Sequence, residues 1–230
     1  MAPRRQPVRL RKKQIPEVSY AFPRGTEQAS RPADVQKVGI YAASFDPVHA
    51  GHIVFALKAQ KLAGLDSIYF VPERRPHHNP DAEHIVHRAV MLKRALKPHR
   101  QFAVLDMPDA CLTSGSLARL RQSLPGNAEV SLLTTASDFL WYQGELPHIY
   151  EAAPLVVAVT SHAQLAEVLA RVHETGRHFH NISFVDVGKD HISSAAIRSG
   201  LRKNQRVRGL LPSVMRYARQ QWLYISPNRG

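Results

Sequence analysis

Cysteine is almost absent from this chain of 230 residues, which contains only Cys111. A single cysteine excludes an internal disulfide framework and is typical of proteins from a reducing compartment. Long apolar runs are also missing, since none approaches the roughly 20 residues that span a bilayer, and the N-terminus lacks the apolar core of a secretory signal. We therefore expect a cytoplasmic protein in which Cys111 is an ordinary thiol, because no histidine or asparagine signature accompanies it.

Two common nucleotide-binding motifs are absent as well. The chain contains neither "GxxxxGK[ST]" nor "GxGxxG". Their absence argues against a P-loop enzyme and against a dinucleotide-binding oxidoreductase. The apolar content, 44%, is ordinary for a globular protein, and one α/β domain can hold most of a chain of this length.

Acidic residues are too few to balance the basic ones. The chain has 31 Lys and Arg against 18 Asp and Glu, a formal net charge of +13 that predicts an anionic partner. Residues 1–36 are basic, are interrupted by prolines and show no apolar periodicity, which predicts a flexible extension that holds such a partner weakly. A targeting presequence is the alternative, although prolines and a low serine content oppose it. We predict one folded domain over 37–225 and a short tail over 226–230.

From Lys37 on, apolar strands alternate with segments of helical periodicity. Strands are predicted over 38–43, 67–72, 102–107, 129–135, 154–160 and 182–187. Helices are predicted over 50–63, 82–96, 116–124, 162–175, 194–203 and 212–223. Continuous apolar strands that alternate with helices predict an α/β fold with a doubly wound, mostly parallel sheet and C-terminal helices. Ligands of such sheets bind beyond the carboxyl ends of the strands, often where the strand order reverses.

The first predicted strand runs into the sequence "ASFDPVHAGH". Pro47 cannot continue a central strand, and Asp46 can accept hydrogen bonds from neighbouring backbone N–H groups in a turn. His49 and His52 have i, i+3 spacing in the first turn of the next helix, so their imidazoles share one side near the free N–H groups of the helix N-terminus. Gly51 leaves room for a ligand or for backbone. The stretch predicts a phosphate cradle, with two partly exposed turn histidines as the alternative.

This stretch resembles the "G-[ST]-F-D-P-x-H-x-G-H" signature of the HxGH nucleotidyltransferases. The later segment "ISSAAIR", residues 192–198, resembles their second signature, "ISST-x-[IV]-R". Within that superfamily the chain is most similar to bacterial nicotinate-nucleotide adenylyltransferases, through "PERRPHH" at 72–78 and an R-x-x-M-L pattern at 88–92. The resemblance covers residues 37–224 and implies a Rossmann-like nucleotidyltransferase fold.

The resemblance also implies three sets of site residues. Those expected to bind the triphosphate and to stabilise its charge in catalysis are His49, His52 and Arg198. Those expected to complete the ATP site, including an aspartate for the ribose, are Ser44, Phe45, Gly51, Asp138, Ser193 and Ser194. Those expected to contact the acceptor are Arg75, His77 and His78. Mg²⁺ would arrive with ATP and would need no protein cage.

The implied reaction transfers AMP from ATP to nicotinate mononucleotide, which gives nicotinate adenine dinucleotide and pyrophosphate in NAD biosynthesis. Several departures from the family pattern keep other acceptors open. The family's S-Y-T segment is replaced by "CLTSGS", its Gly before the ribose-binding aspartate is Ala136, and Trp141 follows Asp138 too closely to match the ring-stacking tryptophan, so we expect it to pack. The alternatives are another phosphorylated acceptor, such as nicotinamide mononucleotide or phosphopantetheine, and a catalytically weakened homologue that binds nucleotide or RNA.

Four histidines at 77, 78, 84 and 87 raise the question of a metal site. The pair at 84 and 87 has i, i+3 spacing on a predicted helix, and the pair at 77 and 78 lies in the loop before it. No cysteine lies near them in the sequence, so we expect no zinc site and assign His77 or His78 to the acceptor instead. The sequence leaves the acceptor, the oligomeric state and the role of the extension open.

Overall fold

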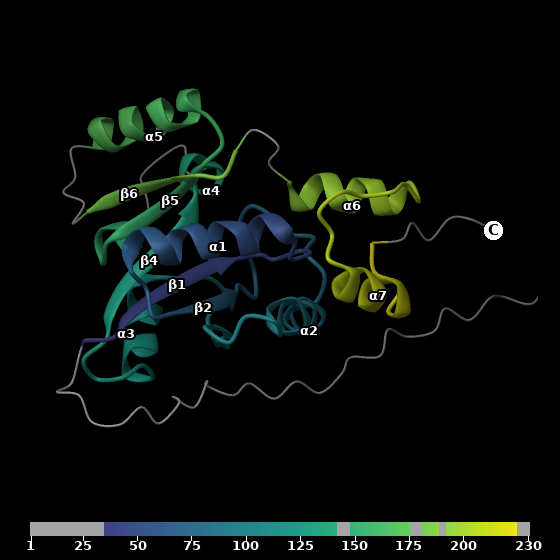
Figure 1. Cartoon of the computed structure of the whole chain (residues 1–230), viewed down its shortest axis with the longest axis horizontal. Coiled ribbons are helices and arrows are strands. Elements are labelled where there is room, and N and C mark those ends of the chain that lie inside the picture. The colour runs from purple at the N-terminus through teal and green to yellow at the C-terminus, as the bar shows by residue number, and fades with distance from the viewer. Residues whose placement is uncertain (1–34, 142–147, 176–180, 189–191, 225–230) are drawn as a thin grey trace, which may run out of the picture.

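Six parallel strands form the sheet at the centre of the fold, in the order β3-β2-β1-β4-β5-β6 (Figure 1). The strands are β1 (Lys37–Ala43), β2 (Ser67–Pro72), β3 (Phe102–Val104), β4 (Glu129–Thr135), β5 (Leu155–Val159) and β6 (Ile182–Asp186). The helices are α1 (Ala50–Ala63), α2 (Ile85–Leu96), α3 (Ser114–Gln122), α4 (Ala136–Trp141), α5 (His162–Thr175), α6 (Ser194–Arg202) and α7 (Pro212–Gln220), with a 3₁₀ helix η1 (His148–Glu151). The computed structural model describes residues 35–141, 148–175, 181–188 and 192–224.

The strand order places the start of the domain in the middle of the sheet. The chain winds outward from β1 to β2 and β3, then returns to the other side of β1 to form β4, β5 and β6. The order therefore reverses between β1 and β4, which opens a crevice at their carboxyl ends because successive connections leave in opposite directions. The predicted doubly wound parallel sheet is confirmed. The predicted extension and C-terminal tail lie outside the described residues, apart from Val35 and Gln36.

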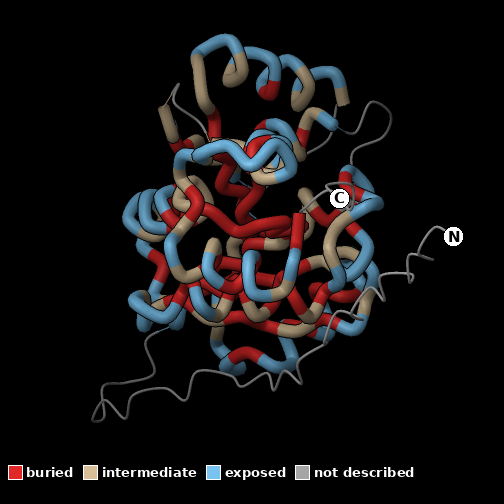
Figure 2. The backbone as a smooth tube through the Cα atoms, turned by 90° about the vertical axis from the view of Figure 1, so that its right-hand side faces the viewer, coloured by how far each residue is buried: buried red, intermediate tan, exposed pale blue. Residues whose placement is uncertain are grey.

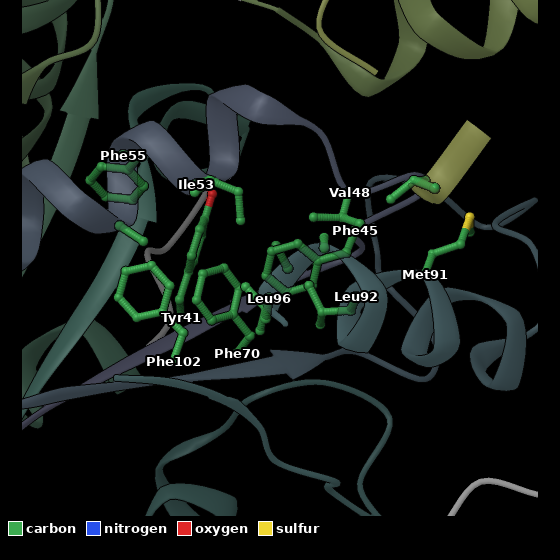
Figure 3. Close-up of a cluster of buried hydrophobic side chains, with 14 of the residues drawn as sticks. Tyr41, Phe45, Val48, Ile53, Phe55, Phe70, Met91, Leu92, Leu96 and Phe102 are labelled. Carbon is green, nitrogen blue, oxygen red and sulfur yellow. The ribbon is translucent and has the colours of Figure 1, made fainter. Parts of the chain in front are cut away.

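Helices cover both faces of the sheet, and each face has its own core. Helices α1, α2, α6 and α7 bury one apolar cluster, whereas α3, α4 and α5 bury another (Figure 1). Figure 2 shows the buried residues mainly in the interior of the molecule and the exposed ones mainly on its outside. In the first cluster the Tyr41 ring lies 5.1 to 5.3 Å from the rings of Phe45, Phe55 and Phe70 (Figure 3). This aromatic cluster supports the loop that follows β1.

Two helices begin at other residues than predicted, because side chains cap them. Helix α2 begins at Ile85 rather than 82, since the His84 ring nitrogen accepts a backbone hydrogen bond in the first turn. Helix α3 begins at Ser114, two residues earlier than predicted, since Thr113 and Ser116 form a capping box.

Three other predictions need correction. Strand β3 has three residues rather than six, and as an edge strand it pairs with β2 alone. Helix α7 ends at Gln220 because Trp222 and Tyr224 have φ angles of 54° and 60°, which a right-handed helix excludes. Helix α4 was not predicted; it follows β4 directly and is capped by Thr135, whose hydroxyl accepts a hydrogen bond from the Asp138 backbone. Within the described ranges, every helix is too short or too polar to cross a membrane.

Candidate active site

A cavity of about 290 Å³ lies at the carboxyl ends of β1, β4, β5 and β6. These strands flank the point where the strand order reverses, which is where the sequence placed the ligand. Nine of the twelve predicted site residues line the cavity: Ser44, His49, Gly51, His52, His78, Asp138, Ser193, Ser194 and Arg198. The three that do not are Phe45, Arg75 and His77. The two signature segments, almost 150 residues apart in the sequence, therefore meet around one space.

The two histidines of the first signature cap helix α1 with their own rings. The Nδ1 atom of His49 accepts a hydrogen bond from the Gly51 backbone N–H, and Nδ1 of His52 accepts one from the His49 backbone N–H, both at 3.1 Å. A backbone N–H can only donate, so a neutral ring must carry its proton on Nε2. The rings stack at a centroid distance of 3.8 Å. The cap thus makes each neutral imidazole a donor on the side away from the helix backbone.

The glycine of this signature is explained by the first histidine. A Cβ atom on Gly51 would lie 2.9 Å from both Nδ1 and Cε1 of His49, closer than side-chain carbons approach other atoms. Any larger residue would therefore push the His49 ring off its backbone hydrogen bond. The spacing of His49, Gly51 and His52 is one structural unit: two rings cap the helix and glycine makes room for the first.

The second signature is fixed against the loop after β1. The Ser193 hydroxyl caps α6 by accepting a backbone hydrogen bond at 3.1 Å, and the first residues of this helix line the cavity. The Ser194 hydroxyl donates to the Pro47 carbonyl oxygen at 3.0 Å. Nη1 of Arg198 donates to the Asp46 carbonyl oxygen at 2.7 Å. Two helix N-termini and one guanidinium, all favourable to phosphate oxygens, therefore border the same cavity.

Asp46 is the centre of a buried hydrogen-bond network. Its side chain is fully buried; Oδ2 accepts from the Asn79 side-chain amide at 3.0 Å, and Oδ1 accepts from the Glu83 backbone N–H at 3.3 Å and from the Tyr224 hydroxyl at 2.6 Å. Nη1 of Arg198 lies 3.7 Å from Oδ2. Burial and the carboxylate of Asp46 raise the pKa of Tyr224 well above its ordinary value. The sequence predicted bonds to neighbouring backbone; the partners are instead distant in the chain.

A second buried charge, Arg88, was missed by the sequence reasoning as a structural element. Its guanidinium is fully buried and donates to the carbonyl oxygens of Ser44 (2.6 Å), Glu73 (2.7 Å) and Glu83 (2.7 Å). Arg88 therefore ties the loop after β1, which carries the phosphate cradle, to the loop after β2, which carries the predicted acceptor residues. One signal was present: Arg88 falls on the apolar face of its helix, where an unpaired charge would be costly.

The start of α4 forms another part of the cavity lining. Oδ2 of Asp138 accepts a hydrogen bond from the Thr135 hydroxyl at 2.8 Å, and Oδ1 lies 3.7 Å from Nε2 of His78. The His78 ring meets the Trp141 ring edge-on, at a centroid distance of 6.5 Å. Trp141 is 48% exposed, so it lies at the surface, and its expected packing role stays a prediction. A carboxylate, an imidazole and an indole ring therefore lie next to one another at this part of the site.

The Phe45 side chain packs in the interior, and the contribution of its backbone to the ATP site stays a prediction. Its side chain is fully buried, and its ring lies 5.1 Å from the rings of both Tyr41 and His52. Its φ angle of 47° places the backbone in the left-handed region, which non-glycine residues adopt only when the surroundings hold them there. Phe45 thus anchors the loop in the aromatic cluster, and its ring packs against the His52 ring.

Arg75 and His77 are exposed and lie outside the cavity lining. Nε2 of His77 lies 3.3 Å from the Cys111 sulfur. The next residue, Leu112, donates its backbone N–H to the Glu73 carboxylate. Burial and the carboxylates of Glu73 and Asp109 raise the pKa of the Cys111 thiol. A raised pKa disfavours the thiolate, which fits an unreactive thiol.

The other histidines of the metal question serve the fold. His84 caps α2, and the buried His87 has Nδ1 at 2.9 Å from the Tyr217 hydroxyl of α7. Among the residues that the structure describes, no three His, Cys, Asp or Glu side chains converge to hold a metal ion. His84 and His87 therefore position helices α2 and α7 relative to each other and to the loop before them.

The model of the cytidylyltransferase-like family matches residues 40–200, which include both signatures and every residue that lines the cavity. The chain belongs to this family and is a nucleotidyltransferase. Among curated relatives it is 30% identical over 213 residues to a "Probable nicotinate-nucleotide adenylyltransferase" of Trichlorobacter lovleyi, with 82% of this chain and 99% of the relative covered. It is 28% identical over 202 residues to the nicotinate-nucleotide adenylyltransferase of Bacillus subtilis strain 168, with 84% and 100% covered. The resemblance to nicotinate-nucleotide adenylyltransferases is confirmed.

Solved structures agree on the fold. The nicotinic acid mononucleotide adenylyltransferase of Plasmodium falciparum, solved with NaAD, superimposes with a TM-score of 0.63 over 82% of this chain and 97% of that one, at 15% identity. The same enzyme solved with APC gives a TM-score of 0.59 at 16% identity. At this level of identity the likeness supports the Rossmann-like nucleotidyltransferase fold.

Proposed function

We propose that this chain transfers AMP from ATP to nicotinate mononucleotide, which yields nicotinate adenine dinucleotide and pyrophosphate. The observation that carries the proposal is the convergence of His49, His52 and Arg198 on one cavity at the strand switch point. These groups supply neutral N–H donors and a fixed positive charge, both suited to a triphosphate. The curated relatives are named for this reaction, and the similarity covers nearly their whole length.

Phosphoryl-type transfer needs positioning and charge stabilisation more than a nucleophile on the protein. We assign the triphosphate to the space between the N-termini of α1 and α6. The Nε2–H donors of His49 and His52 would meet oxygens whose charge grows as pyrophosphate leaves. Arg198, held by Asp46, would meet the outer phosphates, and Ser193 and Ser194 would place the α6 N-terminus beside them. The acceptor phosphate would attack the α-phosphorus from the opposite side.

The adenylate ribose would bind at Asp138, because its carboxylate lies at the cavity and can accept hydrogen bonds from ribose hydroxyls. Asp138 is also the single carboxylate among the described residues that line the cavity. A divalent ion that is held mainly by substrate phosphates and water needs no more than one carboxylate from the protein. The residues therefore fit Mg²⁺ that arrives with ATP, and the ion would neutralise charge on the triphosphate.

The acceptor would lie beside His78, on the loop after β2. Arg75 and His77 belong to the same loop, and their roles as acceptor ligands stay predictions, since both are exposed outside the cavity. A loop with cationic groups favours an acceptor with a phosphate and an extra carboxylate. We therefore expect kcat/KM for nicotinate mononucleotide to exceed that for its amide analogue by about tenfold or more. The charged substrates do not cross membranes unaided, so we place the activity in the cytoplasm.

Pyrophosphate release from Mg-ATP across a panel of acceptors tests the proposal. The panel holds nicotinate mononucleotide, nicotinamide mononucleotide and phosphopantetheine, and product mass identifies the dinucleotide. Turnover that is fastest with nicotinate mononucleotide supports the proposal. Equal use of both mononucleotides, or turnover with phosphopantetheine alone, would keep the enzyme class and change the substrate; the departures at Ala136 and "CLTSGS" make that the second candidate.

A further inference from the structure

The positive charge of residues 37–230 is concentrated in two segments. These residues contain 23 Lys and Arg against 15 Asp and Glu. The segments 84–101 and 191–224 hold twelve of the 23 cations and none of the 15 acids, which leaves the rest with eleven cations against fifteen acids. The first segment contains α2 and the second contains α6 and α7. Outside these two segments, residues 37–230 are net acidic.

The two segments lie together in space. The Arg94 guanidinium of α2 lies 4.7 Å from the centre of the Tyr217 ring on α7, and the Ser213 hydroxyl donates to the Arg94 carbonyl oxygen at 3.5 Å. Helices α6 and α7 occupy one end of the molecule, next to α2 (Figure 1), and this end faces the viewer in Figure 2. We call six of the exposed cations at this end the basic face: Arg94, Arg202, Lys203, Arg206, Arg216 and Arg219.

The basic face is continuous with the triphosphate site but is not part of it. Arg202 follows Arg198 by one helical turn on α6, and neither Arg202 nor the other members of the basic face line the cavity. Arg198 already accounts for the phosphate contact of this helix. Because these six cations lie outside the cavity lining, they are available to a second anionic partner.

One exposed aromatic ring accompanies these cations. Trp222 is 71% exposed, and its backbone N–H donates to the Arg219 carbonyl oxygen at 3.2 Å, which places the residue next to the end of α7. The apolar sides of α6 and α7 are already buried: Ile197, Val214 and Tyr217 are at most 3% exposed. These helices therefore have no free apolar side to insert into a membrane, which an interfacial helix would need.

We propose that the basic face binds the phosphate backbone of single-stranded nucleic acid and that Trp222 stacks on a base. Five of the six cations are arginines, whose planar forks suit phosphate oxygens better than lysine does. Cations that track a backbone, combined with an exposed aromatic ring, are the parts that sequence-tolerant single-strand binders use. The inference does not depend on the acceptor of the enzyme.

Fluorescence anisotropy of a labelled oligouridine with the full chain, over a series of salt concentrations, tests this. The triple variant Arg202→Gln/Lys203→Gln/Arg206→Gln should bind about tenfold or more weakly and flatten the slope of log K against log salt by about 2. Trp222→Ala should weaken binding about fivefold without a change of slope. A control with the same charge change on other helices, Lys61→Gln/Arg119→Gln/Arg121→Gln, should bind as the parent chain does, and pyrophosphate release should be unchanged in all of them.

The remaining outcomes overturn the proposal. Binding that the triple variant retains would place the oligonucleotide elsewhere, on the basic extension for example. Displacement by saturating ATP would place it in the triphosphate cavity. Equal losses in the triple variant and its control would mean that net charge alone governs binding. Binding to phosphatidylserine vesicles with none to the oligouridine would identify a lipid surface as the partner.

Discussion

The Tyr224 hydroxyl donates a hydrogen bond of 2.6 Å to the Asp46 carboxylate, and the two residues are 178 positions apart in the sequence. The bond is buried and connects the end of the described chain to the loop that carries the phosphate cradle. Tyr224→Phe removes the donor and leaves a buried carboxylate oxygen with one partner fewer. We expect the free energy of unfolding to fall by about 1–3 kcal/mol. Urea unfolding of Tyr224→Phe, Asp46→Asn and the double variant measures the coupling; additive effects would contradict a direct interaction.

His52 offers a way to separate the cap from the chemistry. In His52→Asn the side-chain oxygen can replace Nδ1 as the acceptor of the His49 backbone N–H, while the donor at the Nε2 position is lost. We expect a nearly unchanged melting temperature and a kcat about 10²-fold lower, because a donor to the leaving group is missing in the transition state. His52→Ala should lose both the cap and the activity. A near-normal kcat in His52→Asn would remove His52 from the catalytic set.

Arg88 should matter for stability before it matters for chemistry. Arg88→Met removes the buried donor to the carbonyl oxygens of Ser44, Glu73 and Glu83. We expect a loss of about 3 kcal/mol or more in the free energy of unfolding, because each buried acceptor left without a donor costs about 1–3 kcal/mol. Arg100→Met, at an exposed arginine beyond the same helix, is the matched control and should change stability little. A loss similar in both variants would refute the assigned role.

The Glu73 carboxyl predicts a pH dependence of stability. Burial raises its pKa above the ordinary value of 4.5, although the Leu112 backbone N–H opposes the shift. The folded state therefore binds more protons than the unfolded state, and stability falls as pH rises from 4.5 through the folded-state pKa. Glu73→Gln keeps an oxygen acceptor for Leu112 and removes this loss. Thermal unfolding should show the variant gaining on the parent chain as the pH rises to neutrality; a gain confined to low pH would have the wrong sign.

The basic extension is expected to be dispensable for the folded domain. Deletion of residues 1–35 leaves Gln36, whose carbonyl oxygen accepts the Glu129 backbone N–H beside β1. The melting temperature and the affinity for ATP should stay nearly unchanged, because the extension has no apolar pattern for a core. Differential scanning calorimetry and a nucleotide titration measure both. A fall of many degrees would mean that the extension is docked on the domain.

The sequence predicted the sheet well because its strands are apolar runs with clear ends, and it predicted most residues around the cavity because both signatures are short and local. It could not predict Arg88 or Asp46 as organising residues, since their partners come from loops that meet only after the sheet has formed. Gly51 was predicted to make room for a ligand or for backbone, and the sequence did not show that the His49 ring, two residues away, needs this room as well. Helix α4 was not predicted because six residues are too few to show a helical periodicity.

The bonds from Arg198 and Tyr224 to Asp46 also set an order of assembly. The first loop, both histidines and five of the six strands precede residue 160 in the sequence, so they can form while the C-terminal helices are still absent during synthesis. The cavity then lacks its guanidinium, and the buried carboxylate lacks the Arg198 ion pair and the Tyr224 hydrogen bond. Competence for the triphosphate therefore comes last, when α6 and α7 dock. A chain that ended before α6 and α7 would be folded at its centre but would be inactive as an enzyme.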